Sequence, residues 1–171
     1  MRYLFSILLI CIVIISCEKP RKLSSTDPVN WDKRKVTTPI KDSLESGSTF
    51  LSIYSQVYVR NEEEQTDLTV TLSLHNPNLK DKIYIEKAVY YNTHGEPIRT
   101  YFDKTIFINP METVQIIIDE IDSEGGTGAN FVFDWKIKLK TNEPLFEAVM
   151  INTYGQQGIS FVTTGKRIYH E

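Results

Sequence analysis

The chain has 171 residues, of which 41% are hydrophobic, 24% charged and 11% aromatic. This composition is sufficient for a packed core and excludes a chain that is disordered along its whole length. Lys and Arg number 19 against 22 Asp and Glu, a net charge of -3, so the chain has no basic excess with which to bind a nucleic-acid backbone.

Residues 1–16 have the shape of a secretory signal peptide. A positive start, Met1-Arg2, precedes an apolar run over 3–16, which ends at Cys17 and the charged Glu18. A membrane-spanning helix needs about 20 apolar residues, so this run is short for a helix that stays in the membrane. We therefore predict a signal peptide over 1–16. The alternative is a signal-anchor that remains in the inner membrane with Cys17 unmodified.

The segment Ile14-Ile15-Ser16-Cys17 resembles a bacterial lipobox. This resemblance implies that the Cys17 thiol is acylated and that the chain is cut before it, which removes Cys11 and leaves no pair for a disulfide. Two or three acyl chains anchor a protein stably, where one chain is marginal. Glu18 follows the cysteine, which by resemblance to Gram-negative sorting signals implies the outer membrane. The expected location is the bacterial cell envelope, with the periplasmic or surface face left open.

Residues 17–48 differ in composition from the rest of the chain. Ser, Thr, Pro, Lys and Asp prevail, and Pro20, Pro28 and Pro39 interrupt any regular helix or strand. We predict an acylated N-terminus and flexible tether over 17–48, followed by one folded domain over 49–171.

Apolar residues alternate with polar ones after Thr49, which predicts strands with one buried face. The clearest examples are Leu68, Val70, Leu72 and Leu74, and Phe131, Phe133, Trp135, Ile137 and Leu139. Weaker strands are predicted over 50–59, 83–92, 98–108, 113–119, 146–153 and 159–163, with turn residues between them. About eight short strands indicate an all-β fold, an antiparallel two-sheet β-sandwich of immunoglobulin-like type.

Six blocks of the chain carry a family resemblance. They are Tyr54-Ser-Gln-Val-Tyr58, Thr71-Leu-Ser-Leu-His-Asn76, Val89-Tyr-Tyr-Asn-Thr-His-Gly95, Gly125-Gly-Thr-Gly-Ala-Asn-Phe131, Glu147-Ala-Val-Met150 and Gln157-Gly-Ile-Ser-Phe161. In this order they resemble a bacterial envelope family, the domain of unknown function 3124, over about residues 51–167. The resemblance implies no reaction and no ligand.

A glycine-rich loop is the first candidate binding site. It contains Gly125, Gly126, Thr127, Gly128 and Asn130, and consecutive small residues can direct several backbone N–H groups at one anion. A P-loop also needs a Gly-Lys-Ser/Thr ending and a following helix, which are missing here. The alternative is a tight crossover in which the glycines adopt a positive φ.

Four carboxylates precede that loop, on Asp119, Glu120, Asp122 and Glu124. Oxygen ligands of this kind suit calcium, and Asp119, Asp122 and Glu124 are weak calcium candidates. The spacing does not match a calcium-binding loop, so a solvated acidic loop is favoured and no metal site is predicted.

Other chemistry-bearing residues give no catalytic pattern. His75, His94 and His170 lack the spacing of metal ligands, and Ser160 lacks the second glycine of a nucleophile elbow. A tyrosine group could serve as a platform for sugar rings or a protein partner, or pack within the sheets: Tyr84, Tyr90, Tyr91 and Tyr101.

These observations favour a lipid-anchored, non-enzymatic protein-interaction or structural module without a cofactor, whose expected partner besides the membrane is another envelope protein. The first alternative is a module that binds a glycan or calcium. The second is a hydrolase with carboxylates from separate strands, for which no activated nucleophile is visible.

Overall fold

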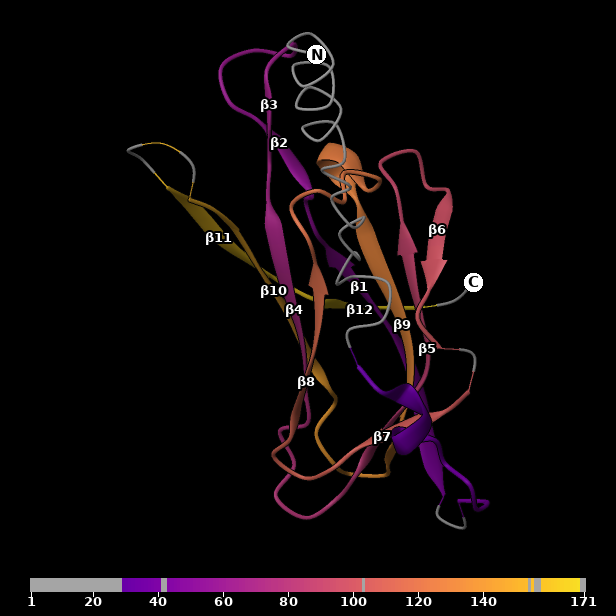
Figure 1. The fold of residues 1–171 in the computed structure, drawn as a ribbon. Helices are drawn as coiled ribbons and strands as arrows, with labels where there is room; N and C mark the ends of the chain where they lie inside the picture. The colour runs from indigo at the N-terminus through magenta and orange to yellow at the C-terminus, as the bar shows by residue number, and fades with distance from the viewer. Residues whose placement is uncertain (1–28, 41–42, 103, 154, 156–157, 170–171) are drawn as a thin grey trace, which may run out of the picture.

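The computed structural model describes residues 29–40, 43–102, 104–153, 155 and 158–169 (Figure 1). Their regular structure consists of short 3-10 helices and antiparallel strands. In chain order these are η2 (Trp31–Arg34), β1 (Leu44–Ser52), β2 (Gln56–Tyr58), β3 (Gln65–Asp67), β4 (Thr69–His75), β5 (Ile83–Tyr91), β6 (Pro97–Thr100), β7 (Ile106–Ile108), β8 (Thr113–Ile118), η3 (Gly126–Gly128), β9 (Asn130–Lys138), β10 (Leu145–Asn152), β11 (Ile159–Thr164) and β12 (Lys166–Ile168).

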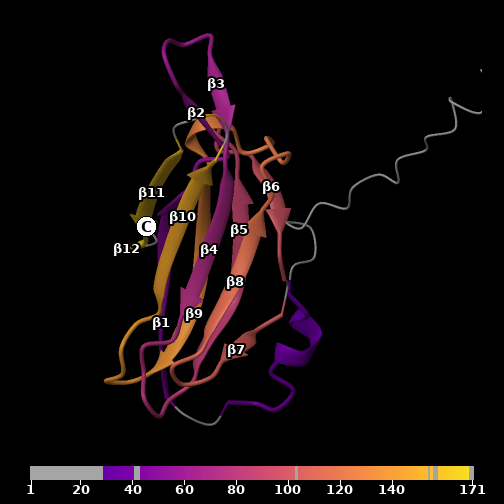
Figure 2. The same ribbon diagram turned by 60° about the vertical axis from the view of Figure 1, so that its left-hand side comes forward.

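Two sheets form a sandwich, which confirms the predicted all-β antiparallel class (Figure 2). The first sheet has the order β12-β1-β9-β5-β6, with β7 also paired to β5, and the second has the order β11-β10-β4-β8. Strands β2 and β3 form a separate hairpin at one end (Figure 2). The described residues form twelve strands rather than the predicted eight. The segments predicted over 50–59 and 98–108 each contain two strands, and the short strands β3 and β12 were not predicted.

The inward faces of both sheets meet in an aromatic core. Phe133 stacks on Phe146 across the sandwich at 4.2 Å between ring centroids, and Phe131 lies between Phe133 and Tyr90 at 5.4 and 5.0 Å. Trp135 is fully buried, and its indole N–H donates a 2.9 Å hydrogen bond to the Thr49 hydroxyl. The inward direction predicted for Phe131, Phe133, Trp135 and Ile137 is therefore confirmed. The prediction was wrong for Leu139, because β9 ends at Lys138 and Leu139 is 52% exposed.

Strand β1 begins before the predicted domain boundary. It starts at Leu44, so a boundary at Thr49 falls inside the strand, and β1 pairs with β9 along its whole length. Gly47 lies opposite Trp135 and leaves room for the indole ring, because a Cβ atom there would meet the ring at 2.5 and 2.9 Å from Cη2 and Cε2. A strand with glycine at an inward position shows no apolar alternation, so the sequence pattern misses it.

The described part of the predicted tether packs on the domain. Trp31 in η2 lies 4.8 Å from Phe102 between ring centroids. The Arg34 guanidinium forms a 2.8 Å ion pair with Glu112, and the backbone N–H of Val36 donates to the Thr105 carbonyl. Residues 29–36 thus cover β7 rather than forming a free linker, and residues 17–28 of the prediction lie outside the described residues.

The segment that contains β11 and β12 joins both sheets. Strand β11 pairs with β10 in the second sheet, and after Gly165 the chain continues as β12, which pairs with β1 in the first. The N–H of Gly165 donates to the Phe146 carbonyl at 2.8 Å, and a Cβ atom at this position would lie 2.7 Å from Thr49 Cγ2. The close approach at Gly165 lets one segment close this side of the sandwich.

Buried asparagine side chains hold the loops at the end of the sandwich opposite the β2–β3 hairpin (Figure 2). The Asn76 side chain is buried and donates to the carbonyls of Asp81, Ile108 and Asn109 at 2.9 to 3.0 Å. The Asn78 side chain donates to the Asn142 carbonyl at 2.9 Å. The segment Asn76-Pro77-Asn78 therefore holds three loops in place.

Candidate functional site

The glycine loop is packed against its neighbours. Thr93 bridges it, since its hydroxyl donates to the Gly125 carbonyl at 3.0 Å and accepts from the Gly128 N–H at 2.9 Å. The Gly126 N–H donates to the Ser123 carbonyl, and Gly126 has a φ of 71°. Because two N–H groups already have partners in the protein, this geometry fits the crossover alternative better than an anion cradle.

Gly125 shows why small residues gather in this loop. A Cβ atom there would overlap the Tyr90 hydroxyl and lie 2.8 Å from the Cβ of Ala129. The chain then enters β9 at Asn130. Glycine at 125 is thus explained by a close approach to the core.

Arg99 on β6 binds two of the three weak calcium candidates, Asp122 and Glu124. Its guanidinium binds the Asp122 carboxylate at 3.1 Å and the Glu124 carboxylate at 3.0 Å, and the Asp122 side chain is fully buried. The Asp119 carboxylate instead accepts from the Ile121 N–H at 3.3 Å. Within the described ranges, no group of three His, Cys, Asp or Glu side chains is arranged to hold a metal ion.

Two of the four candidate tyrosines belong to the core. Tyr90 is fully buried, and Tyr101 packs at 5.4 Å from Phe131 and lies within 3.3 Å of the Arg99 guanidinium. Burial raises the pKa of Tyr101 to about 12, and it raises that of Tyr90 further. A platform of Tyr84, Tyr90, Tyr91 and Tyr101 is therefore excluded, because β5 points Tyr90 inward.

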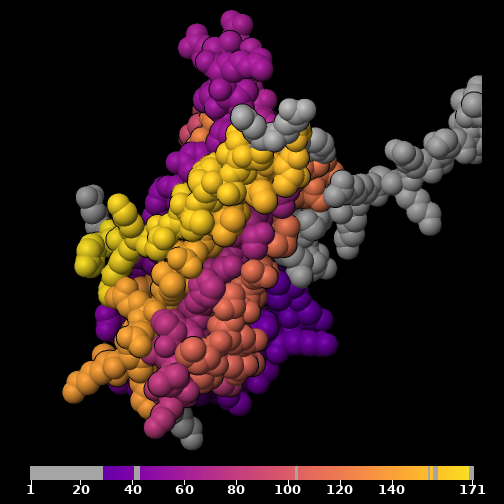
Figure 3. Space-filling model, turned by 90° about the vertical axis from the view of Figure 1, so that its left-hand side faces the viewer, coloured from indigo at the N-terminus to yellow at the C-terminus, as the bar shows by residue number. Residues whose placement is uncertain are grey.

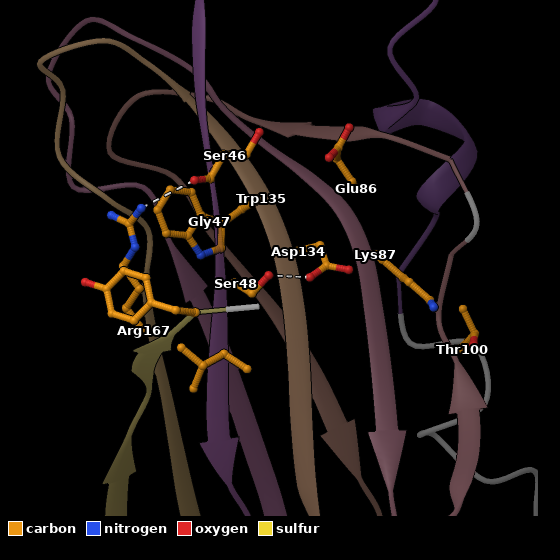
Figure 4. Close-up of a pocket in the computed structure, with 11 residues that line it drawn as sticks. Ser46, Gly47, Ser48, Glu86, Lys87, Thr100, Asp134, Trp135 and Arg167 are labelled. Atoms are coloured by element: carbon orange, nitrogen blue, oxygen red, sulfur yellow. Dashed lines mark hydrogen bonds between the residues drawn. The ribbon is translucent and has the colours of Figure 1, made fainter. Parts of the chain in front are cut away.

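A groove of about 610 Å³ lies on the outer face of the first sheet, and none of the predicted site residues lines it (Figure 4). Ser48 on β1 and Asp134 on β9 lie in its floor and share a 2.6 Å hydrogen bond. Lys87 and Thr100 lie on one side, and Arg167 lies on the other (Figure 4). The groove spans strands β12 to β6 of the sheet.

A β-bulge places two charged side chains beside this groove. The register between β5 and β9 shifts between Ile85 and Lys87, which inserts Glu86 as an extra residue. Glu86 and Lys87 both line the groove as a result, and the Glu86 carboxylate forms a 2.7 Å ion pair with Lys136. Bulges redirect side chains in this way and are frequent beside functional sites.

The outer face of the second sheet, formed by β11, β10, β4 and β8, faces the viewer in Figure 3. Several apolar side chains on this face are exposed. Val162 of β11 lies opposite Val149 of β10, Val149 lies opposite Thr71 of β4, and Thr71 lies opposite Ile117 of β8. Val162 and Val149 are 59% and 40% exposed, and Ile151 in the next row is 39% exposed. We call Ile117, Val149, Ile151 and Val162 the apolar row.

The remaining candidates do not form a site together. His75 contacts the Thr113 hydroxyl at 2.8 Å and Glu147 at 3.5 Å on the second sheet, whereas His94 lies in the turn before β6. Cys17 and His170 lie outside the described residues. Among the residues that are described, no helix has the length and apolar character needed to cross a membrane.

The fold and these surfaces define a β-sandwich domain with an open groove on one sheet and an apolar row on the other. Residues 46–168 match the model of a family described as a protein of unknown function, DUF3124. The chain belongs to this family. The predicted resemblance is confirmed, and the match includes most of β1, which the predicted boundary cut.

Comparison with curated proteins and with solved structures adds little. No curated protein matches the chain in sequence. The crystal structure of Thermotoga maritima 1070 resembles the chain with a TM-score of 0.43 and 9% identity, over 70% of this chain and 92% of that one. Likeness at this level carries no argument about function.

Proposed function

We propose that the protein is a lipid-anchored, non-enzymatic interaction module of the bacterial cell envelope, most consistent with the outer membrane. The lipobox-like Ile14-Ile15-Ser16-Cys17 supports the anchor. Acylation of Cys17 by two or three chains would retain the domain at a membrane stably. The domain then acts by contact with another envelope protein.

The apolar row is the observation that supports a protein partner. Its members lie on three strands of one sheet, β8, β10 and β11, and its side chains on β10 and β11 remain well exposed. Contiguous exposed apolar side chains mark interaction surfaces, because burying each one removes apolar area from water. Strand β11 adds a sheet edge without a charged residue, which is the kind of edge that pairs with another chain.

Four acidic side chains are held in ion pairs that do not suit the general acid of a hydrolase: Asp32, Glu112, Asp122 and Glu124. A general acid of a hydrolase needs a carboxyl pKa raised toward neutral pH. The hydrogen bond from Arg34 instead lowers the pKa of Glu112, and the one from Lys35 lowers that of Asp32. Asp122 and Glu124 are held by Arg99.

Two experiments test this proposal. The first compares the membrane fraction of wild-type cells with that of cells carrying Cys17→Ala, with mass spectrometry of the N-terminal peptide. We expect acylated Cys17 in the wild type and loss of the acyl mass in the variant. An unmodified cysteine in a mature chain that still contains residues 1–16 would refute the lipid anchor.

The second experiment replaces Val162 by a photo-crosslinking amino acid in intact cells. Leu139, which is 52% exposed and lies outside the apolar row, receives the same replacement as the matched control. We expect a discrete cross-linked protein from position 162 that is missing from position 139. Equal products from both positions, or none from position 162, would contradict a partner at the apolar row.

A further inference from the structure

The groove on the first sheet has the features of a binding site that is separate from the apolar row. It lies on the opposite sheet of the sandwich, and its volume of about 610 Å³ is within the range of pockets that hold small ligands. Its lining comes from five strands or their ends, including the segment that follows β12. A ligand lying across these strands would contact residues distant in the chain.

The groove has a built floor. The backbone of Gly47 lies against the buried indole of Trp135, and the guanidinium of Arg167 lies 5.2 Å from the Trp135 ring. Glu45 and Glu143 both form ion pairs with Arg167 and hold it in place. Because these ion pairs already fix the Arg167 side chain, it loses little conformational entropy when a ligand binds, which favours affinity.

The charges that line the groove balance one another. Glu86 is paired with Lys136, and Arg167 is paired with Glu45 and Glu143. Asp134 and Lys87 then contribute one charge of each sign to the lining. A site for a phosphate or a carboxylate would carry an excess of positive charge, and a site for a cation would carry an excess of carboxylates. The balance therefore favours a ligand without net charge.

The polar groups of the floor suit a ligand rich in hydroxyl groups. The Asp134 carboxylate lies between Ser48 and Lys87 (Figure 4), and Ser46 and Thr100 add further hydroxyl groups to the lining. Carboxylates accept hydrogen bonds from hydroxyl groups, and ammonium groups donate to them, so neighbouring residues of both kinds can bind one polyol.

An exposed aromatic ring completes the site. Tyr169 lines the groove and is 83% exposed, and the Arg167 guanidinium lies 5.7 Å from its ring. A tyrosine ring offers an apolar face with a polar edge, which suits the C–H face of a sugar ring surrounded by hydroxyl groups. We propose that this groove binds a neutral oligosaccharide, with Tyr169 stacking on a sugar ring and Asp134 and Lys87 binding its hydroxyl groups.

Binding of the full chain, purified in detergent, to immobilised oligosaccharides tests this proposal. The probes are neutral oligomers of glucose, mannose and N-acetylglucosamine, with oligogalacturonate as the anionic comparison. We expect binding to at least one neutral oligomer. Failure to bind any neutral oligomer, or binding to oligogalacturonate alone, would overturn the proposal.

Variants then locate the binding in the groove. Tyr169→Ala and Asp134→Asn should each weaken the affinity for the bound oligomer about tenfold or more. Tyr58→Ala is the matched control, since Tyr58 is also an exposed tyrosine, 54% exposed on the β2–β3 hairpin. Unchanged affinity in Tyr169→Ala, whose ring is too exposed to support the fold, would overturn the assignment even if Asp134→Asn misfolds.

This test is independent of the proposed function. Replacing Val162 alters the second sheet and leaves the groove intact, so a change at position 162 should not alter oligosaccharide binding. Loss of the cross-linked partner with binding retained would refute the interaction module alone.

Discussion

Gly47→Ala should destabilise the domain through one steric conflict. The added methyl would lie 2.5 Å from Cη2 and 2.9 Å from Cε2 of Trp135, and closer still to Cζ2. Trp135 is fully buried and cannot swing into solvent. Overpacking of this kind lowers the free energy of unfolding by about 1–3 kcal/mol. Alanine also restricts the backbone of the unfolded chain more than glycine does, which raises the free energy of unfolding by about 0.4–1 kcal/mol. We therefore expect a net decrease of about 1–2 kcal/mol.

A second substitution isolates the cause. Trp135→Phe removes the outer indole ring that the new methyl would strike, although it also removes the hydrogen bond to Thr49. By itself it should cost about 2–3 kcal/mol from the lost bond and buried area. In its background, Gly47→Ala should cost almost nothing, which gives a coupling energy of about 1–2 kcal/mol between the two positions.

Urea unfolding followed by circular dichroism measures all four chains of this cycle, each beginning at Pro28 so that every described residue is retained. The free energy of unfolding in water follows from the midpoint and slope of each transition. The reasoning would be refuted if Gly47→Ala cost as much with Phe at position 135 as with Trp. In that case the loss would come from the backbone of β1 and not from the ring.

Three further predictions use other parts of the domain. Asn76→Ala should lower the free energy of unfolding by about 1–3 kcal/mol, because three loop carbonyls lose their donor, and a loss below about 0.5 kcal/mol in urea unfolding would contradict this. Folded Tyr101 should deprotonate near pH 12 rather than 10 by absorbance at 295 nm; since the unfolded phenol ionises first, stability should fall as pH rises from about 10 to 12, and fall less in Tyr101→Phe. Glu112→Gln should loosen η2, seen as faster amide exchange there, and because the folded pKa of Glu112 is lowered, the stabilisation that it gives should be lost as pH falls below about 4; protection unchanged at pH 7 would refute the role of its ion pair with Arg34.

The sandwich was predictable from sequence because most of its strands have a simple period. In β4 and β9 every second residue is apolar, and the structure buries those residues. Strand β1 was missed before Thr49, because Ser46, Gly47 and Ser48 carry no apolar alternation. They form a strand because β9 supplies the backbone partners and the Trp135 indole fills the space that a side chain at position 47 would take.

The groove could not be predicted for a related reason. Its lining depends on the bulge at Glu86 and on the return of the chain at Arg167, and neither is a property of a short segment. This bulge lies in β5 before Val89 and Tyr90, two neighbouring residues that are both buried. Strict alternation would leave one of the two exposed, so it predicts the burial of this part of β5 wrongly. The glycine-rich and acidic loops could be recognised from their residue types. Their contacts with Thr93 and Arg99 could not be predicted, because those residues lie elsewhere in the chain and only the fold brings them together.

The pairing of β1 with β9 bears on when the domain can fold. The hydrogen bond between Ser48 and Asp134 joins residues 86 positions apart, and Arg167 then returns to Glu45 from a still later point in the chain. Closing such long loops slows folding, since the entropy is lost before the contacts form. Strand β1 is synthesised well before β9 and β12, so it stays unpaired until those strands have emerged. Under the proposed location in the cell envelope, this delay would keep the chain extended until its transfer is nearly complete.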